Sequence, residues 1–97
     1  MKKFDLARHA LKDLQEIWEF VSEDSLTAAD RLLEEFYQTF GQLAAMPGMG
    51  HKREDLTHRN VLFWGLHSYL VIYRASQPLR VVRVIHAKRD LKKLLAR

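Results

Sequence analysis

The hydrophobic period of the chain changes once, between Ala45 and Asn60, and no other feature constrains the fold as strongly. Before this change, apolar residues recur at spacings of three and four, as on one face of an α-helix. After it, short runs of β-branched and aromatic residues alternate with turn residues, as in strands. The sequence therefore predicts an α+β fold. A length of 97 residues suits a single domain, 1–97, because two separate cores would each be too small to be stable.

Two amphipathic helices are expected in the first half of the chain. In each, apolar residues share one side and charged residues occupy the other, with Asp13 on the polar side of the first helix. Thr27 is expected to cap the second helix, because Asp30 follows it at the spacing of a capping box. Pro47 should end this helix, since proline disfavours helix at the residue before it. A short polar turn between the helices predicts an antiparallel hairpin.

Three strands are expected after Asn60, within residues 61–66, 69–75 and 79–86. The close turns between them predict an antiparallel meander, and residues 2–6 could add a first strand. The helical hairpin should pack on one face of this three- or four-stranded, mainly antiparallel, curled sheet. A short C-terminal helix is expected at Asp90–Arg97. The residues predicted to form the core are Leu14, Ile17, Leu33, Phe36 and Ile72.

Both faces of the predicted sheet are apolar. On the middle strand, Leu70 and Ile72 lie on one face, and Tyr69, Val71 and Tyr73 lie on the other. Two helices can cover only one face. The other face would need the terminal helix, a second chain or a bound partner.

The C-terminal quarter is basic, within a chain of net charge +4 and pI of about 9.6. Such a segment suits a nucleic acid or an acidic protein segment, although it could also be an ordinary solvated face. Combined with the apolar sheet face, it gives the candidate partner-binding residues: Tyr69, Val71, Tyr73, Arg74, Arg83, Lys88, Arg89, Lys92 and Lys93.

Several classes of site and location are not expected. The chain has no cysteine, so it can form neither a disulfide nor a cysteine zinc site. Its histidines lack metal-ligand spacing, and no phosphate-binding glycine loop is present, so neither a metal nor a cofactor is predicted. No apolar run approaches the length of a membrane span or a signal sequence. A soluble cytoplasmic protein without membrane contact is therefore expected.

Cleavage of RNA by its own 2′-hydroxyl would need a proton acceptor, a proton donor and cations near the phosphate. His86 is the best candidate acid or base, and Arg53, Arg74 and Arg83 could hold phosphate, with Tyr69 or Tyr73 as a donor. The competing interpretation is structural, with His86 bonded to Asp90 and the arginines in ordinary ion pairs. The sequence alone establishes no catalytic residue.

Four segments in their observed order resemble the RelE/ParE family of bacterial toxins from type II, or plasmid stabilisation, toxin–antitoxin systems. They span almost the whole chain and comprise Ala10–Trp18, Met46–Leu56, Tyr69–Arg74, and Val82–His86 with Arg89-Asp90. The resemblance implies a strand, two helices and a curled antiparallel meander. It also implies a cognate antitoxin that wraps the toxin, and through the antitoxin a contact with operator DNA.

This family has two branches with different targets. RelE-like members are ribosome-dependent mRNA endonucleases, whereas ParE-like members inhibit DNA gyrase. The ending His86-Ala87-Lys88-Arg89-Asp90 and the long helical hairpin resemble the ParE branch. A gyrase-inhibiting toxin, not an enzyme, is the first hypothesis. The alternatives are an endonuclease that acts on ribosome-bound mRNA and a non-toxic nucleic-acid-binding domain.

Overall fold

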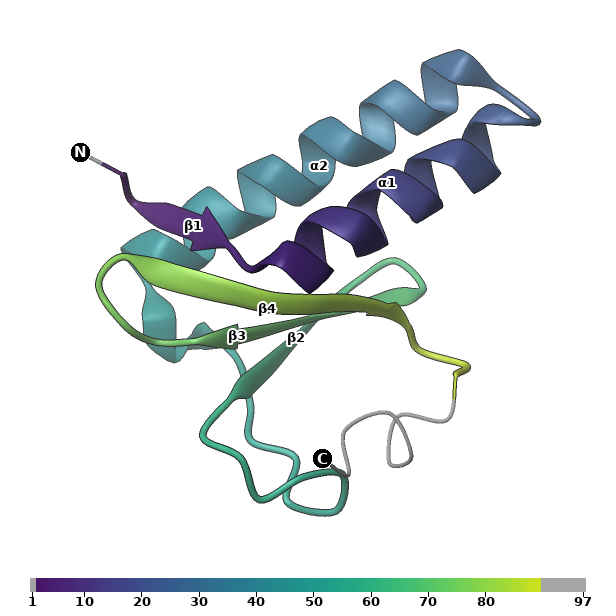
Figure 1. The fold of residues 1–97 in the computed structure, drawn as a ribbon. Coiled ribbons are helices and arrows are strands. Elements are labelled where there is room, and N and C mark those ends of the chain that lie inside the picture. Colours follow the sequence, from purple (N-terminus) through teal and green to yellow (C-terminus); the bar gives the residue numbers. More distant parts are fainter. Residues whose placement is uncertain (1, 90–97) are drawn as a thin grey trace.

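The computed structural model describes residues 2–89 and has an α+β architecture in which two helices lie against one sheet (Figure 1). The order of elements is β1, α1, α2, a single 3-10 turn, β2, β3 and β4. This confirms the predicted fold class. The C-terminal helix expected at Asp90–Arg97 falls outside the described residues. No helix in the described part combines the length and the apolar character needed to cross a membrane.

Helices α1 (Arg8–Ser22) and α2 (Leu26–Ala45) form the predicted antiparallel hairpin, and its turn projects beyond the sheet (Figure 1). The N-cap of α2 is Ser25, whose hydroxyl accepts a hydrogen bond of 3.1 Å from the Ala28 N–H. The prediction of Thr27 as the cap was wrong by two residues. Both residues can cap a helix, and the extended backbone that a cap requires occurs at Ser25.

The sheet contains four strands, β1 (Phe4–Leu6), β2 (Leu62–Leu66), β3 (Tyr69–Arg74) and β4 (Leu79–His86), in the order β1-β4-β3-β2. The three later strands form the predicted antiparallel meander. The short first strand, which the sequence left open, pairs in parallel with the start of β4. A shift in register makes Val82 an extra residue in β4, between the positions opposite Ile72 and Tyr73.

The main core lies between the hairpin and one face of the sheet. Val71 and Tyr73 of β3 point into it and are fully buried. Three of the predicted core residues, Leu14, Phe36 and Ile72, are buried. The other two, Ile17 and Leu33, are partly buried and pack against the core.

The second face of the sheet is buried within the chain itself. Val61, Phe63, Ile72 and Ile85 form a separate apolar cluster there, with Ile72 and Ile85 each only 1% exposed. The connection between α2 and β2 contributes Leu56, which packs against this cluster. Of the covers expected from the sequence, neither a second chain nor a bound partner is therefore needed for this cluster.

Tyr73 ties β3 to the turn that follows α2. Its hydroxyl donates to the Pro47 carbonyl oxygen at 2.7 Å and accepts from the Gly50 N–H at 2.9 Å. Burial raises the pKa of Tyr73, so the hydroxyl keeps its proton and its donor role. A Cβ atom at Gly50 would lie 2.5 Å from this hydroxyl oxygen, so glycine is required by the close approach of the two groups.

Gly50→Ala should lower the free energy of unfolding by about 1–3 kcal/mol, because the new methyl group must displace a buried and hydrogen-bonded hydroxyl. Gly48→Ala is the matched control, since no atom lies within 4 Å of a Cβ there. Its effect should stay within about 0.5 kcal/mol. Urea unfolding of both variants measures the difference, and equal losses would contradict the role of this contact.

Candidate partner-binding groove

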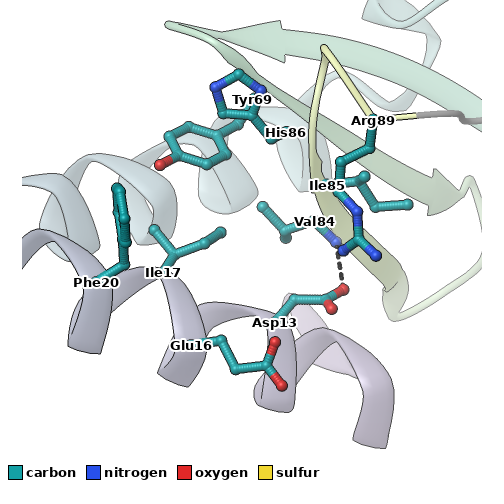
Figure 2. A pocket seen from close by; sticks show the side chains of 9 residues that line it. All are labelled: Asp13, Glu16, Ile17, Phe20, Tyr69, Val84, Ile85, His86 and Arg89. Atoms are coloured by element: carbon teal, nitrogen blue, oxygen red, sulfur yellow. Dashed lines mark hydrogen bonds between the residues drawn. The ribbon is translucent and has the colours of Figure 1, made fainter.

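A groove of about 340 Å³ separates α1 from the C-terminal end of β4. Figure 2 shows its walls: α1 runs along one side, and the ends of β3 and β4 form the other. We call it the α1–β4 groove. It is lined by Asp13, Glu16, Ile17, Phe20, Tyr69, Val84, Ile85, His86 and Arg89.

Phe20 gives the groove its most unusual side chain. It is 69% exposed, the highest value among the large hydrophobic residues that the structure describes as exposed. Ile17, one turn earlier on α1, is partly buried, and together the two residues form the apolar part of the α1 wall. A single exposed hydrophobic residue needs no explanation, but an exposed aromatic beside an apolar groove is typical of a binding site.

Tyr69 and His86 form the opposite wall near the end of the sheet. Their rings pack edge to face with centroids 5.3 Å apart, and Tyr69 packs in the same way on the buried Phe36 at 5.5 Å. The Nδ1 atom of His86 accepts a hydrogen bond of 3.1 Å from the Lys88 N–H. These contacts fix the wall in place.

Asp13 lines the groove and forms an ion pair with Arg83. The Asp13 carboxylate accepts two hydrogen bonds from the Arg83 guanidinium, at 2.8 and 3.0 Å. This hydrogen-bonded pair raises the pKa of Arg83 above its ordinary value. Asp13 is only 9% exposed, so its placement on a solvated helix side was wrong. The predicted role of Arg83 in binding phosphate or a partner is not favoured, because its guanidinium already holds Asp13.

Asp13 also completes the exposed edge of β4. Strand β1 pairs with β4 only from Leu79 to Val81, so within residues 2–89 the rest of that edge has no neighbouring strand. The Val84 N–H on this edge donates to Asp13 Oδ2 at 2.9 Å (Figure 2). A carboxylate from α1 thus takes the place of the carbonyl oxygen that a further strand would supply.

The candidate catalytic residues do not meet at one point. Arg74 lies at the opposite end of β3 from Tyr69, whose partner in the ladder is His86. Arg53 is in the connection before β2, where its Nε and Nη2 atoms donate to the Asp55 carboxylate at 3.1 and 3.0 Å. Of the candidate catalytic groups, His86 is therefore joined by Tyr69 but not by Arg53 or Arg74, and Arg89 is the arginine that lines the groove with it. No three potential metal ligands come together within residues 2–89.

Apart from Arg83, which holds Asp13, the candidate partner-binding residues divide into four groups. Tyr69 and Arg89 line the α1–β4 groove, and Lys88 lies between the two lining residues His86 and Arg89. Arg74 is exposed but lies at the far end of the sheet. Val71 and Tyr73 were wrong as contact residues, because both are buried beneath the hairpin. Lys92 and Lys93 lie outside the described residues.

Phe20 and Glu16 were missed as site residues by the sequence analysis. Phe20 falls outside the apolar stripe that Leu14, Ile17 and Val21 define. This position of a large aromatic residue was the feature of the sequence that could have identified Phe20 as a site residue. A large aromatic beside a stripe widens the apolar surface of a helix beyond what one neighbour can cover.

Comparisons with known proteins agree with this architecture. A family model described as the ParE toxin of the type II toxin–antitoxin system, parDE, matches residues 4–91. Toxin ParE1 of Caulobacter vibrioides is 30% identical over 87 residues, which cover 89% of this chain and 90% of that protein. A solved structure titled as the chromosomal ParDE TA system from P. aeruginosa matches with a TM-score of 0.73. It is 16% identical and covers 91% of this chain and 98% of that chain, and at this identity it shows the fold alone.

The family model spans nearly all of the described residues, and the Caulobacter relative has a similar length. This protein therefore belongs to the ParE toxin family of type II toxin–antitoxin systems.

Proposed function

We propose that this protein arrests growth by inhibiting DNA gyrase and that a cognate antitoxin neutralises it by occupying the α1–β4 groove. The observation that carries the first half is the match to the ParE toxin family over residues 4–91. The separation of His86 from Arg53 and Arg74 adds support, because an endonuclease would need such groups around one phosphate. The site of action would be the cytoplasm.

The second half of the proposal rests on the groove. The groove contains Phe20, whose side chain is 69% exposed. A partner that removes this apolar area from water gains binding free energy. The other sheet face carries a cluster that is already buried within the chain, whereas the groove keeps an exposed apolar side chain. Tyr69, Lys88 and Arg89 are the earlier partner candidates that fit this site. Contact with operator DNA would come through the antitoxin.

Induction of this protein alone should stop growth, and co-expression of the antitoxin encoded beside it should restore growth. The purified toxin should block DNA supercoiling by gyrase, and the antitoxin should relieve this block. Ribosome-bound mRNA should stay intact in the same preparations. Cleavage of that mRNA, abolished by His86→Ala, would replace the proposal with a RelE-like endonuclease. Normal growth after induction would favour a non-toxic nucleic-acid-binding domain.

A further inference from the structure

The exposed edge of β4 is closed to an added strand at its middle residue. A partner strand would have to offer a carbonyl oxygen to the Val84 N–H, which already donates to Asp13. Removing Asp13 from this position would also separate it from Arg83 and leave a partly buried guanidinium without its carboxylate. A partner in the α1–β4 groove is therefore expected to bind through its side chains.

Glu16 supplies the available charge on the α1 wall. It is exposed, it lines the groove one turn after Asp13, and within residues 2–89 it makes no hydrogen bond or close ion pair. Asp13, in contrast, has both oxygens engaged by Arg83 and Val84. A cation that enters the groove would therefore be attracted to Glu16, although the nearby Arg83 moderates the attraction.

The part of the hairpin that carries this wall is rich in acidic residues. Residues 13–35 of the hairpin carry a single basic residue, Arg31, and most of the acidic residues of the chain. The acidic residues in this range are Asp13, Glu16, Glu19, Glu23, Asp24, Asp30, Glu34 and Glu35. The remainder of the chain is basic, and on the groove itself the positive charge comes from Arg89, on the wall opposite α1. A partner that approaches α1 therefore gains from positive charge, which these acidic residues attract.

We propose that the antitoxin segment that fills the α1–β4 groove is apolar and basic: its hydrophobic side chains contact Phe20 and Ile17, and a lysine or arginine pairs with Glu16. It lies in the groove through side-chain contacts and does not extend the sheet at Val84. This inference rests on the proposed function. The basic C-terminal quarter of the toxin suggests an acidic partner, whereas the inference makes the docking segment of the antitoxin basic.

The test uses the full-length toxin and overlapping synthetic peptides that cover the antitoxin sequence, with affinities measured by isothermal titration calorimetry. The peptides that bind should contain hydrophobic residues next to a lysine or arginine. Glu16→Lys should weaken binding about tenfold at low salt, and Glu16→Gln should weaken it less. Raised salt should reduce the difference from the unaltered toxin. Phe20→Ala should weaken binding by about tenfold or more at any salt concentration.

Two control variants match these changes elsewhere on the hairpin. Glu34→Lys makes the same change of charge on an exposed site of α2, and Leu26→Ala truncates a side chain that is 63% exposed but outside the groove. Each should change the affinity less than twofold. All four altered residues are exposed, so thermal unfolding should be nearly unchanged.

Charge reversal on both sides gives the decisive result. A peptide in which the basic residue becomes glutamate should bind poorly to the unaltered toxin and better to Glu16→Lys. If the antitoxin binds and neutralises the toxin but Glu16→Lys behaves like Glu34→Lys, this inference fails and the proposed function stands. Failure of the antitoxin to bind or neutralise at all would refute the proposed function. If Glu16→Lys and Phe20→Ala impair gyrase inhibition while antitoxin binding is unchanged, the groove belongs to the target and the inference is overturned.

Discussion

Asp13→Ala should lower the free energy of unfolding by about 3–5 kcal/mol, the range for removing one partner of a buried ion pair. Three hydrogen bonds end at this carboxylate, two from Arg83 and one from the Val84 N–H. The side chains of Arg83 and Asp13 are only 20% and 10% exposed, so water cannot fully replace what is lost. The bonds also join residues 70 and 71 positions apart, which fixes α1 against β4.

The control for this prediction is Asp5→Ala, which breaks the ion pair between Asp5 and Arg80 at 2.8 Å. That pair is more exposed, with side chains 44% and 31% accessible, so its loss should cost about 0–1 kcal/mol. Guanidinium chloride unfolding of the two variants makes the comparison. A loss below about 1 kcal/mol for Asp13→Ala would mean that solvent screens the pair.

Replacing both Asp13 and Arg83 separates two quantities: the net contribution of the ion pair to the free energy of unfolding, and the cost of leaving one buried charge unpaired. Asp13→Leu with Arg83→Met removes the orphaned charge, so the double variant should recover much of the stability lost in Asp13→Ala. The Val84 N–H would then be left without its acceptor and would offer an open strand edge. The double variant should therefore self-associate more readily than the unaltered protein, as light scattering can measure.

The fold was predictable because the spacing of apolar residues is helical in the first half of the chain and typical of strands in the second half. Leu14 and Phe36 recur with other apolar residues at helical spacing, and the strands after Asn60 are separated by short turns. The covering of the second sheet face was not predictable in the same way. It involves Leu56, a single apolar residue in a polar connection that has no hydrophobic period. Only the folded arrangement places Leu56 against the cluster that contains Ile72 and Ile85.

The groove residues were hard to predict for a related physical reason. Helical periodicity sorts side chains around the helix axis, but it does not say which neighbour lies on each side. Asp13 looks solvated on α1 alone and becomes buried only because the open edge of β4 runs beside it. The edge exists because β1 stops at Leu6, a boundary that no pattern in the first seven residues specifies.

The errors for Val71 and Tyr73 have a different origin. The sequence correctly separated the two faces of β3, but it could not say which face the hairpin covers. The hairpin covers the face with Val71 and Tyr73, and the connection before β2 covers part of the other. The contact between the rings of His86 and Tyr69 could not be predicted either, because it depends on the register of β3 and β4.

Phe36→Ala should lower the free energy of unfolding by about 3–5 kcal/mol, the usual cost of removing a buried phenylalanine ring. Phe36 is 1% exposed at the centre of the main core. Its ring packs edge to face on Tyr69 at 5.5 Å and lies 6.3 Å from the ring of Phe40. Truncation would leave a cavity between α2 and the sheet that neighbouring rings, held by their own contacts, could fill only in part.

Tyr37→Ala is the matched control, since it removes the neighbouring aromatic side chain from the same helix. Tyr37 is 41% exposed, although it also packs against Phe4 and Phe40, so its loss should cost about 1–2 kcal/mol. Urea unfolding measures both variants. Because Phe36 supports Tyr69 on one wall of the α1–β4 groove, Phe36→Ala should also weaken antitoxin binding at temperatures where the protein stays folded. Equal costs for the two variants would mean that α2 repacks around the lost ring and that the Tyr69 wall does not depend on it.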